Sequence, residues 1–175
     1  MSNPASSSAA LPLAYAVLRI LIVVNWIGGA AIALLLFALP TRRWLMISLG
    51  LTPSPEADQV IMGFHAIATL GLVAVPLHYV VLKRLLAIVE TVREGDAFVA
   101  ANAARLQAIA WSLFVLQLLS IVIGAIAKII STPAHPIKLD AGFSISGWLA
   151  VLLTFVLARV FAEGTIMRED LDGTV

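Results

Sequence analysis

The chain of 175 residues contains no cysteine and few charged side chains. Without cysteine it forms no disulfide, no thiolate metal site and no thiol redox centre. Only 12% of its residues are charged, and the formal net charge is +1. A soluble domain is about a quarter charged. A balance this close to neutral gives no long-range field toward nucleic acid, so we expect no direct nucleic acid binding.

Catalytic signatures are also missing. The sequence has no HExxH pair, no Walker loop, no glycine-rich dinucleotide fingerprint and no recognisable serine, histidine and carboxylate set. No aspartate or glutamate falls within its apolar runs, which argues against a proton-coupled cation exporter. We therefore expect a non-enzymatic protein with no cofactor and no metal. A membrane enzyme would require Asn25, a histidine and loop carboxylates to gather in one cavity.

The chain is instead rich in long runs of apolar residues. It is 61% hydrophobic with a mean hydropathy of +1.03, more than one soluble core of this size can bury. About twenty apolar residues cross a bilayer as a helix. Four runs meet that requirement, at residues 18–39, 60–83, 106–128 and 143–161. The sequence predicts an all-α polytopic membrane protein, a four-transmembrane-helix bundle in contact with the lipid bilayer.

The remaining residues divide the chain into three parts. We expect a flexible N-terminal tail at residues 1–12, a membrane domain at 13–163 and a cytoplasmic tail at 164–175. The N-terminus lacks a basic region, and the first apolar run is longer than a signal-peptide core, so we expect no cleaved signal.

The second run continues as a helix beyond its span. Apolar residues recur at helical spacing from Leu85 to Val92, and Gly95 is a good terminator. A helix over residues 59–94 would be about 54 Å long, whereas the hydrocarbon core needs about 30 Å. This pattern predicts a long second helix projecting into the cytoplasm, with Phe98 packed against the projection.

Basic residues suggest an orientation. Four spans place both termini on one side, together with the middle loop. Seven of the eleven basic residues fall on that side, and four, including the Arg42–Arg43 pair, on the other. The positive-inside rule then predicts that both termini are cytoplasmic.

Few amide or ionisable side chains lie near the middle of the membrane: Asn25, His65, His78 and Gln117. The two histidines are about 20 Å apart along one helix and point to different faces, so they cannot share a metal. We expect Asn25 and Gln117 to link helices by hydrogen bonds, and each histidine to be a buried hydrogen-bond partner or an interface residue. With Pro76 and small-residue faces such as Gly29 with Ala33, they leave open a small permease or lipid-handling protein, as a monomer or a homo-oligomer.

The segments expected to lie in water have a more specific sequence pattern than the spans. Residues 159–175 hold two basic and four acidic side chains, and residues 83–105 hold four basic and three acidic. The opposite net charges allow the tail to dock on the middle loop. Such docking either only completes the end of the bundle or forms a surface for a soluble partner.

Two stretches resemble a known family. Leu157–Val175 and Glu94–Trp111 are similar to the signatures of small four-helix bacterial membrane proteins grouped as domain of unknown function family 2975. Ala97 stands where the family pattern has proline. The resemblance implies a bacterial inner membrane protein without an established activity. Family members often lie beside a gene for a small helix-turn-helix regulator, which implies a membrane sensor or anchor for a cytoplasmic regulator.

The candidate docking residues are chosen from the positions at which the two stretches match the family pattern. They are Asp96, Phe98, Asn102, Arg105, Glu163, Arg168 and Asp170.

Overall fold

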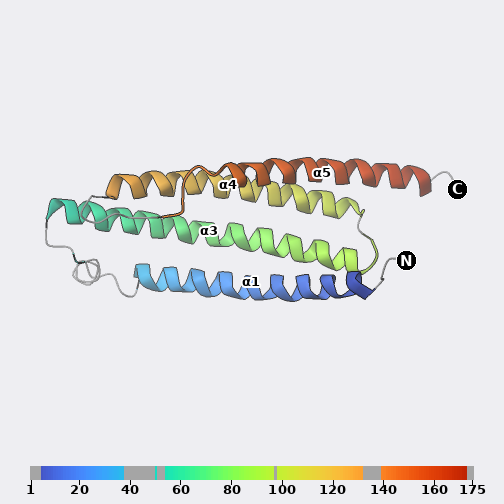
Figure 1. The fold of residues 1–175 in the computed structure, drawn as a ribbon, viewed down its shortest axis with the longest axis horizontal. Coiled ribbons are helices and arrows are strands. Elements are labelled where there is room, and N and C mark those ends of the chain that lie inside the picture. Colours follow the sequence, from blue (N-terminus) through green and yellow to red (C-terminus); the bar gives the residue numbers. More distant parts are fainter. Residues whose placement is uncertain (1–4, 38–49, 51–53, 97, 132–138, 173–175) are drawn as a thin grey trace.

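The computed structural model describes residues 5–37, 50, 54–96, 98–131 and 139–172. These residues form four helices: α1 (Ala5–Phe37), α3 (Pro55–Arg93), α4 (Ala100–Ile130) and α5 (Ile145–Asp172) (Figure 1). The all-helical prediction is confirmed.

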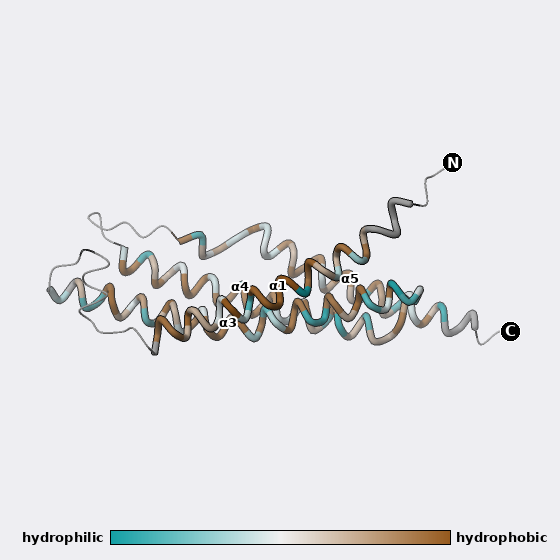
Figure 2. The backbone as a smooth tube through the Cα atoms, turned by 90° about the horizontal axis from the view of Figure 1, so that it is seen from below, coloured by the Kyte–Doolittle hydropathy of each residue, from teal (hydrophilic) through white to brown (hydrophobic). Residues whose placement is uncertain are grey.

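Each of the four helices is long and apolar enough to cross a membrane. The qualifying stretches have 27, 37, 31 and 24 residues, with mean hydropathies between 2.0 and 2.4. Apolar residues recur along all four helices in Figure 2, and many large apolar side chains are exposed. Such surfaces are stable against lipid and unstable against water. The prediction of a multi-pass membrane protein therefore agrees with the structure.

The helices pack as an open row. Helix α1 contacts α3, α3 contacts α4, and α4 contacts α5, and no other pair of the described helices is in contact. Figure 1 shows them side by side in this order. The predicted bundle is thus not closed, because α1 and α5 each have one neighbour. Lipid makes this arrangement tolerable, since apolar surface gains little by leaving lipid for a helix.

The structure does not support a second helix that projects alone. The start of α1, the end of α5 and the α3–α4 turn lie at one end of the row (Figure 1), which we call the termini end. Helix α1 already begins at Ala5, within the expected flexible tail, and α5 continues to Asp172, through most of the expected separate tail. The last turns of α3 are therefore accompanied by other helices.

Helix α3 is well capped at its start and continuous through its proline. The Ser54 hydroxyl accepts a hydrogen bond from the Ala57 amide at 3.1 Å, and Pro55 occupies the first turn, where its missing N–H costs nothing. Pro76 lies inside the helix without ending it.

The contact between α1 and α3 is centred on Val75. The Asn25 side-chain amide donates to the Val75 carbonyl at 3.2 Å. One turn along α1, Gly29 is buried against the same residue, and a Cβ on Gly29 would lie 2.9 Å from Val75 Cγ1. The small-residue face predicted for this run is used here for close approach.

Near the termini end, a buried cluster of apolar side chains joins α3, α4 and α5. Leu106 and Ile109 of α4 pack with Ala158 of α5, and Val81 and Leu85 of α3 pack against them. The basic residues of α3 and α5 next to this cluster are Lys83, Arg84 and Arg159, which we call the basic belt. Basic residues favour the membrane interface, so the belt indicates where the hydrocarbon region ends.

Gly29→Leu should loosen α1 from α3, because the new side chain must displace Val75. We expect a loss of about 1–3 kcal/mol, the usual cost of overpacking. Gly28→Leu is the matched control, because no atom lies within 4 Å of a Cβ at Gly28. Equilibrium unfolding in mixed micelles measures both variants. Equal stability of the two variants would contradict the assigned contact.

Candidate functional site at the termini end

The turn that joins α3 to α4 has a defined geometry. Gly95 adopts φ +90°, a left-handed conformation that other residues rarely accept. Its amide donates to the Val92 carbonyl at 3.2 Å, and the Asp96 amide donates to the Thr91 carbonyl at 3.0 Å. These two bonds form a Schellman motif. The predicted terminator is therefore correct, and the motif fixes the direction in which Asp96 leaves the helix.

Asn102 is the most buried polar side chain described, with 0% of its surface exposed. Its Nδ2 donates to the Thr91 hydroxyl at 2.8 Å, and its Oδ1 accepts from Arg105 at 2.8 Å. The Thr91 hydroxyl lies 2.8 Å from the Ile88 carbonyl, so its single proton is best placed there. The Arg105 guanidinium also donates to the Ala87 carbonyl at 3.0 Å. This Asn102 network joins α4 to the last turns of α3.

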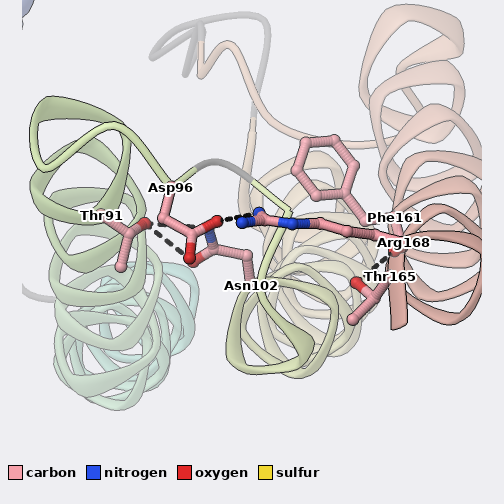
Figure 3. Close-up of polar contacts among 6 residues, drawn as sticks. All are labelled: Thr91, Asp96, Asn102, Phe161, Thr165 and Arg168. Atoms are coloured by element: carbon pink, nitrogen blue, oxygen red, sulfur yellow. Dashed lines mark hydrogen bonds and ion pairs between the residues drawn. The ribbon is translucent and has the colours of Figure 1, made fainter. Parts of the chain in front are cut away.

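Asp96 and Arg168 form an ion pair across the end of the row. Figure 3 shows the Asp96 carboxylate, carried by the turn, directed toward the guanidinium that reaches over from α5. About half of each side chain is exposed, 44% for Asp96 and 50% for Arg168. The pair links two segments that are 72 positions apart in the sequence. Docking of the chain end on the middle loop is thus realised within one molecule.

Phe98 adds an apolar contact to the same junction. Its ring stacks on Phe161 of α5, with centroids 5.2 Å apart, and a Cβ on Gly164 would lie 3.3 Å from it. The ring thus contacts α5, which presents a glycine where the ring approaches, and its expected contact with the end of α3 stays a prediction. Phe98 nevertheless remains 47% exposed. We call Asp96, Phe98, Phe161, Gly164 and Arg168 the α5 clasp.

The other predicted docking residues are placed differently. Glu163 is exposed and pairs with Arg159 of its own helix at 2.7 Å, an i, i+4 pair. Asp170 lies in α5, but its side chain is outside the described residues. The six candidates whose side chains are described therefore separate into a buried network, a clasp and an exposed pair.

A groove adjoins that exposed pair. It has a volume of about 370 Å³ and runs between the first turns of α4 and the second half of α5. Its lining consists of Ala103, Ala104, Gln107, Phe155, Ala158, Arg159 and Ala162.

The four polar residues predicted within the membrane do not come together. Asn25 bonds to α3, as described above. His65 and His78 each direct Nδ1 at a carbonyl one turn earlier, Ile61 and Ala74, both at 2.9 Å. A carbonyl only accepts, so Nδ1 carries the proton in each ring.

Gln117 lies against α5 at Gly147, where a Cβ would be 1.5 Å from its amide nitrogen. A second cavity reaches His65, but it holds only about 80 Å³ and is otherwise lined by Leu35, Leu36, Phe64 and Ala68. Within the described ranges, no three histidine, aspartate or glutamate side chains are close enough to hold a metal ion.

Several contributing residues were not found from the sequence. Thr91 receives the Asn102 amide, yet an isolated threonine on a helix carries no signal for this role. Tyr15 is another example. Its ring makes cation–π contacts with Arg19 of α1 and Arg93 of α3, whose guanidinium carbons lie 4.8 Å and 5.1 Å from the ring centroid. The contact with Arg93 holds α1 against α3 at the termini end. Only the pairing of helices reveals these partners.

The fold and the site define an all-helical, multi-pass membrane protein with its specific polar contacts at one end. The family model for proteins of unknown function DUF2975 matches residues 66–175. The chain belongs to this family, and the resemblance noted in its two signature stretches is confirmed. No curated protein and no solved structure matches the chain.

Asn102→Leu should destabilise the hairpin of α3 and α4. The substitution removes the acceptor of Arg105 and the donor to Thr91, and we expect a loss of about 1–3 kcal/mol from these buried groups. Thr69→Val is the control, because Thr69 is exposed and bonds only within its own helix. Thermal unfolding in detergent compares the variants. A loss no larger than that of the control would refute the structural role of the network.

The Asp96–Arg168 pair should contribute little to global stability. Because both side chains are half exposed, we expect a coupling of about 0.2–1 kcal/mol in a double-mutant cycle with Asp96→Asn and Arg168→Gln. Amide hydrogen exchange of the last turns of α5 should rise in each single variant. Unchanged exchange in that segment would show that the pair does not hold it.

Proposed function

We propose that this protein is a non-enzymatic inner membrane protein whose termini end faces the cytoplasm and docks a small soluble helix-turn-helix regulator, as its sensor or anchor. The observation that carries the proposal is the α5 clasp, which gathers specific polar and aromatic contacts on one aqueous end. The described membrane-embedded residues offer no comparable cluster.

Exposed apolar side chains at the termini end support a docking role. Phe98, Ile166 and Met167 are 47%, 58% and 62% exposed. All three lie beyond the level of the basic belt, where lipid tails no longer cover them. Apolar side chains in such a position are stabilised when a protein partner covers them.

The clasp also gives the surface a defined shape. The Schellman turn and the Asn102 network hold Asp96 and Phe98 in place, so a partner meets a preorganised junction. Preorganisation lowers the entropy lost on binding. The half-exposed ion pair leaves charged groups at the rim of the apolar residues, as interfaces commonly have.

The regulator and the orientation come from two further arguments. The family resemblance implies a helix-turn-helix protein encoded nearby. The basic residues favour the termini side as cytoplasmic by seven to four. Together they favour the termini end as the side that a cytoplasmic regulator would meet.

The test is co-purification of the full chain from native membranes. We expect a small DNA-binding protein to be recovered with the wild type and lost when residues 164–175 are deleted. Because the deletion also removes Gly164 and Arg168 of the clasp, Met167→Ser serves as a second variant that changes only the exposed surface. Gly28→Ser, far from this end, is the matched control. Recovery that is insensitive to both changes would contradict the proposal.

A further inference from the structure

The groove between α4 and α5 lies at the level where lipid headgroups are expected. Ala158, which lines the groove, packs with Leu106 and Ile109 in the buried cluster that also contacts α3 near the basic belt. Its neighbour Arg159 belongs to the belt. The groove therefore lies near the expected boundary between hydrocarbon and water.

The groove has an apolar end and a polar middle. At the membrane-side end lies Phe155, whose ring packs edge-to-face on Trp111 with centroids 5.4 Å apart. Alanines line most of the remaining length of the groove, and their small side chains leave space above the helix backbones. Gln107 and Arg159 provide the polar groups, and Gln107 is exposed. A volume of about 370 Å³ is within the range of small-molecule sites.

The charges beside the groove follow the order of a zwitterionic headgroup. Arg159 Nε donates to Glu163 at 2.7 Å, and the described residues provide no other bond to the two terminal nitrogens of Arg159. Since α5 runs from the membrane toward the termini end, the backbone of Glu163 lies one turn, about 6 Å along the axis, farther out than that of Arg159, and the two charged groups are in contact. In an aminophospholipid the phosphate is likewise the inner charge and the ammonium the outer one.

We propose that this groove binds a phospholipid with a zwitterionic headgroup. The phosphate accepts hydrogen bonds from the terminal nitrogens of Arg159 and from the Gln107 amide. The ammonium pairs with Glu163, and the acyl chains extend along Phe155 toward the membrane interior. An anionic lipid would also meet Arg159 but would place its second polar group beside Glu163 without a compensating positive charge.

The test uses the full chain in detergent, with native mass spectrometry of bound lipid. The probes are phosphatidylethanolamine and phosphatidylglycerol with identical acyl chains. We expect the wild type to prefer phosphatidylethanolamine. Arg159→Gln should weaken its binding about tenfold, the usual effect of losing a charge-assisted contact to phosphate. Glu163→Gln should abolish the preference by raising phosphatidylglycerol binding.

Two further variants separate the groove from general surface charge. Arg84→Gln removes an exposed basic residue of the same belt outside the groove and should change nothing. Ala104→Leu narrows the groove without altering its charge and should weaken both lipids. All four substitutions are at exposed positions, so folding is retained.

Three results would overturn the proposal. Equal binding of both lipids by the wild type would remove the headgroup assignment. Unchanged lipid binding in Arg159→Gln or Ala104→Leu would show that the lipid does not bind in the groove. A dimer that forms in place of the lipid-bound monomer would assign the groove to a second copy of the chain. None of these results depends on the soluble partner proposed above.

Discussion

The hydrogen bonds of the Asn102 side chain hold the central pair of helices in register. The amide is fully buried, and it connects a threonine of α3 to an arginine of α4 that in turn reaches back to a carbonyl of α3. In lipid, apolar surface gains little by leaving lipid for a helix, whereas each of these bonds forms in one register only. Since α1 packs only on α3 and α5 only on α4, the positions of the outer helices follow from this central pair.

At the termini end, the Asp96–Arg168 ion pair adds little stability but positions the last turns of α5. An ion pair with half of each side chain exposed adds little to stability. Its geometric consequence is larger, because α3 and α5 are not neighbours in the row and the turn is the segment that reaches α5. The clasp therefore sets where the last turns of α5 lie relative to the turn. A ligand that prefers one arrangement of these segments would need only a small free energy to shift it.

The sequence was sufficient for the features that depend on composition and local pattern. The four spans follow from apolar length, the end of α3 from Gly95, and the close approach of α1 from Gly29. The features that depend on helix pairing were not accessible. A four-helix pattern does not say whether the row closes, so the open arrangement was missed. The contact of Phe98 with α5 was not predicted, because a sequence does not show that Gly164 leaves space for its ring. Thr91 and Tyr15 acquire their roles only from residues of neighbouring helices.

The open row has a consequence for biogenesis. A membrane protein enters the bilayer from its N-terminus, one span after another. Here every described helix finds its contacts on the helix that precedes or follows it in the chain, so α3 can pack on α1 and α4 on α3 as each one arrives. No span has to wait in lipid for a partner that is made much later. Such short-range connectivity favours fast assembly, because little chain entropy is lost in bringing neighbouring segments together.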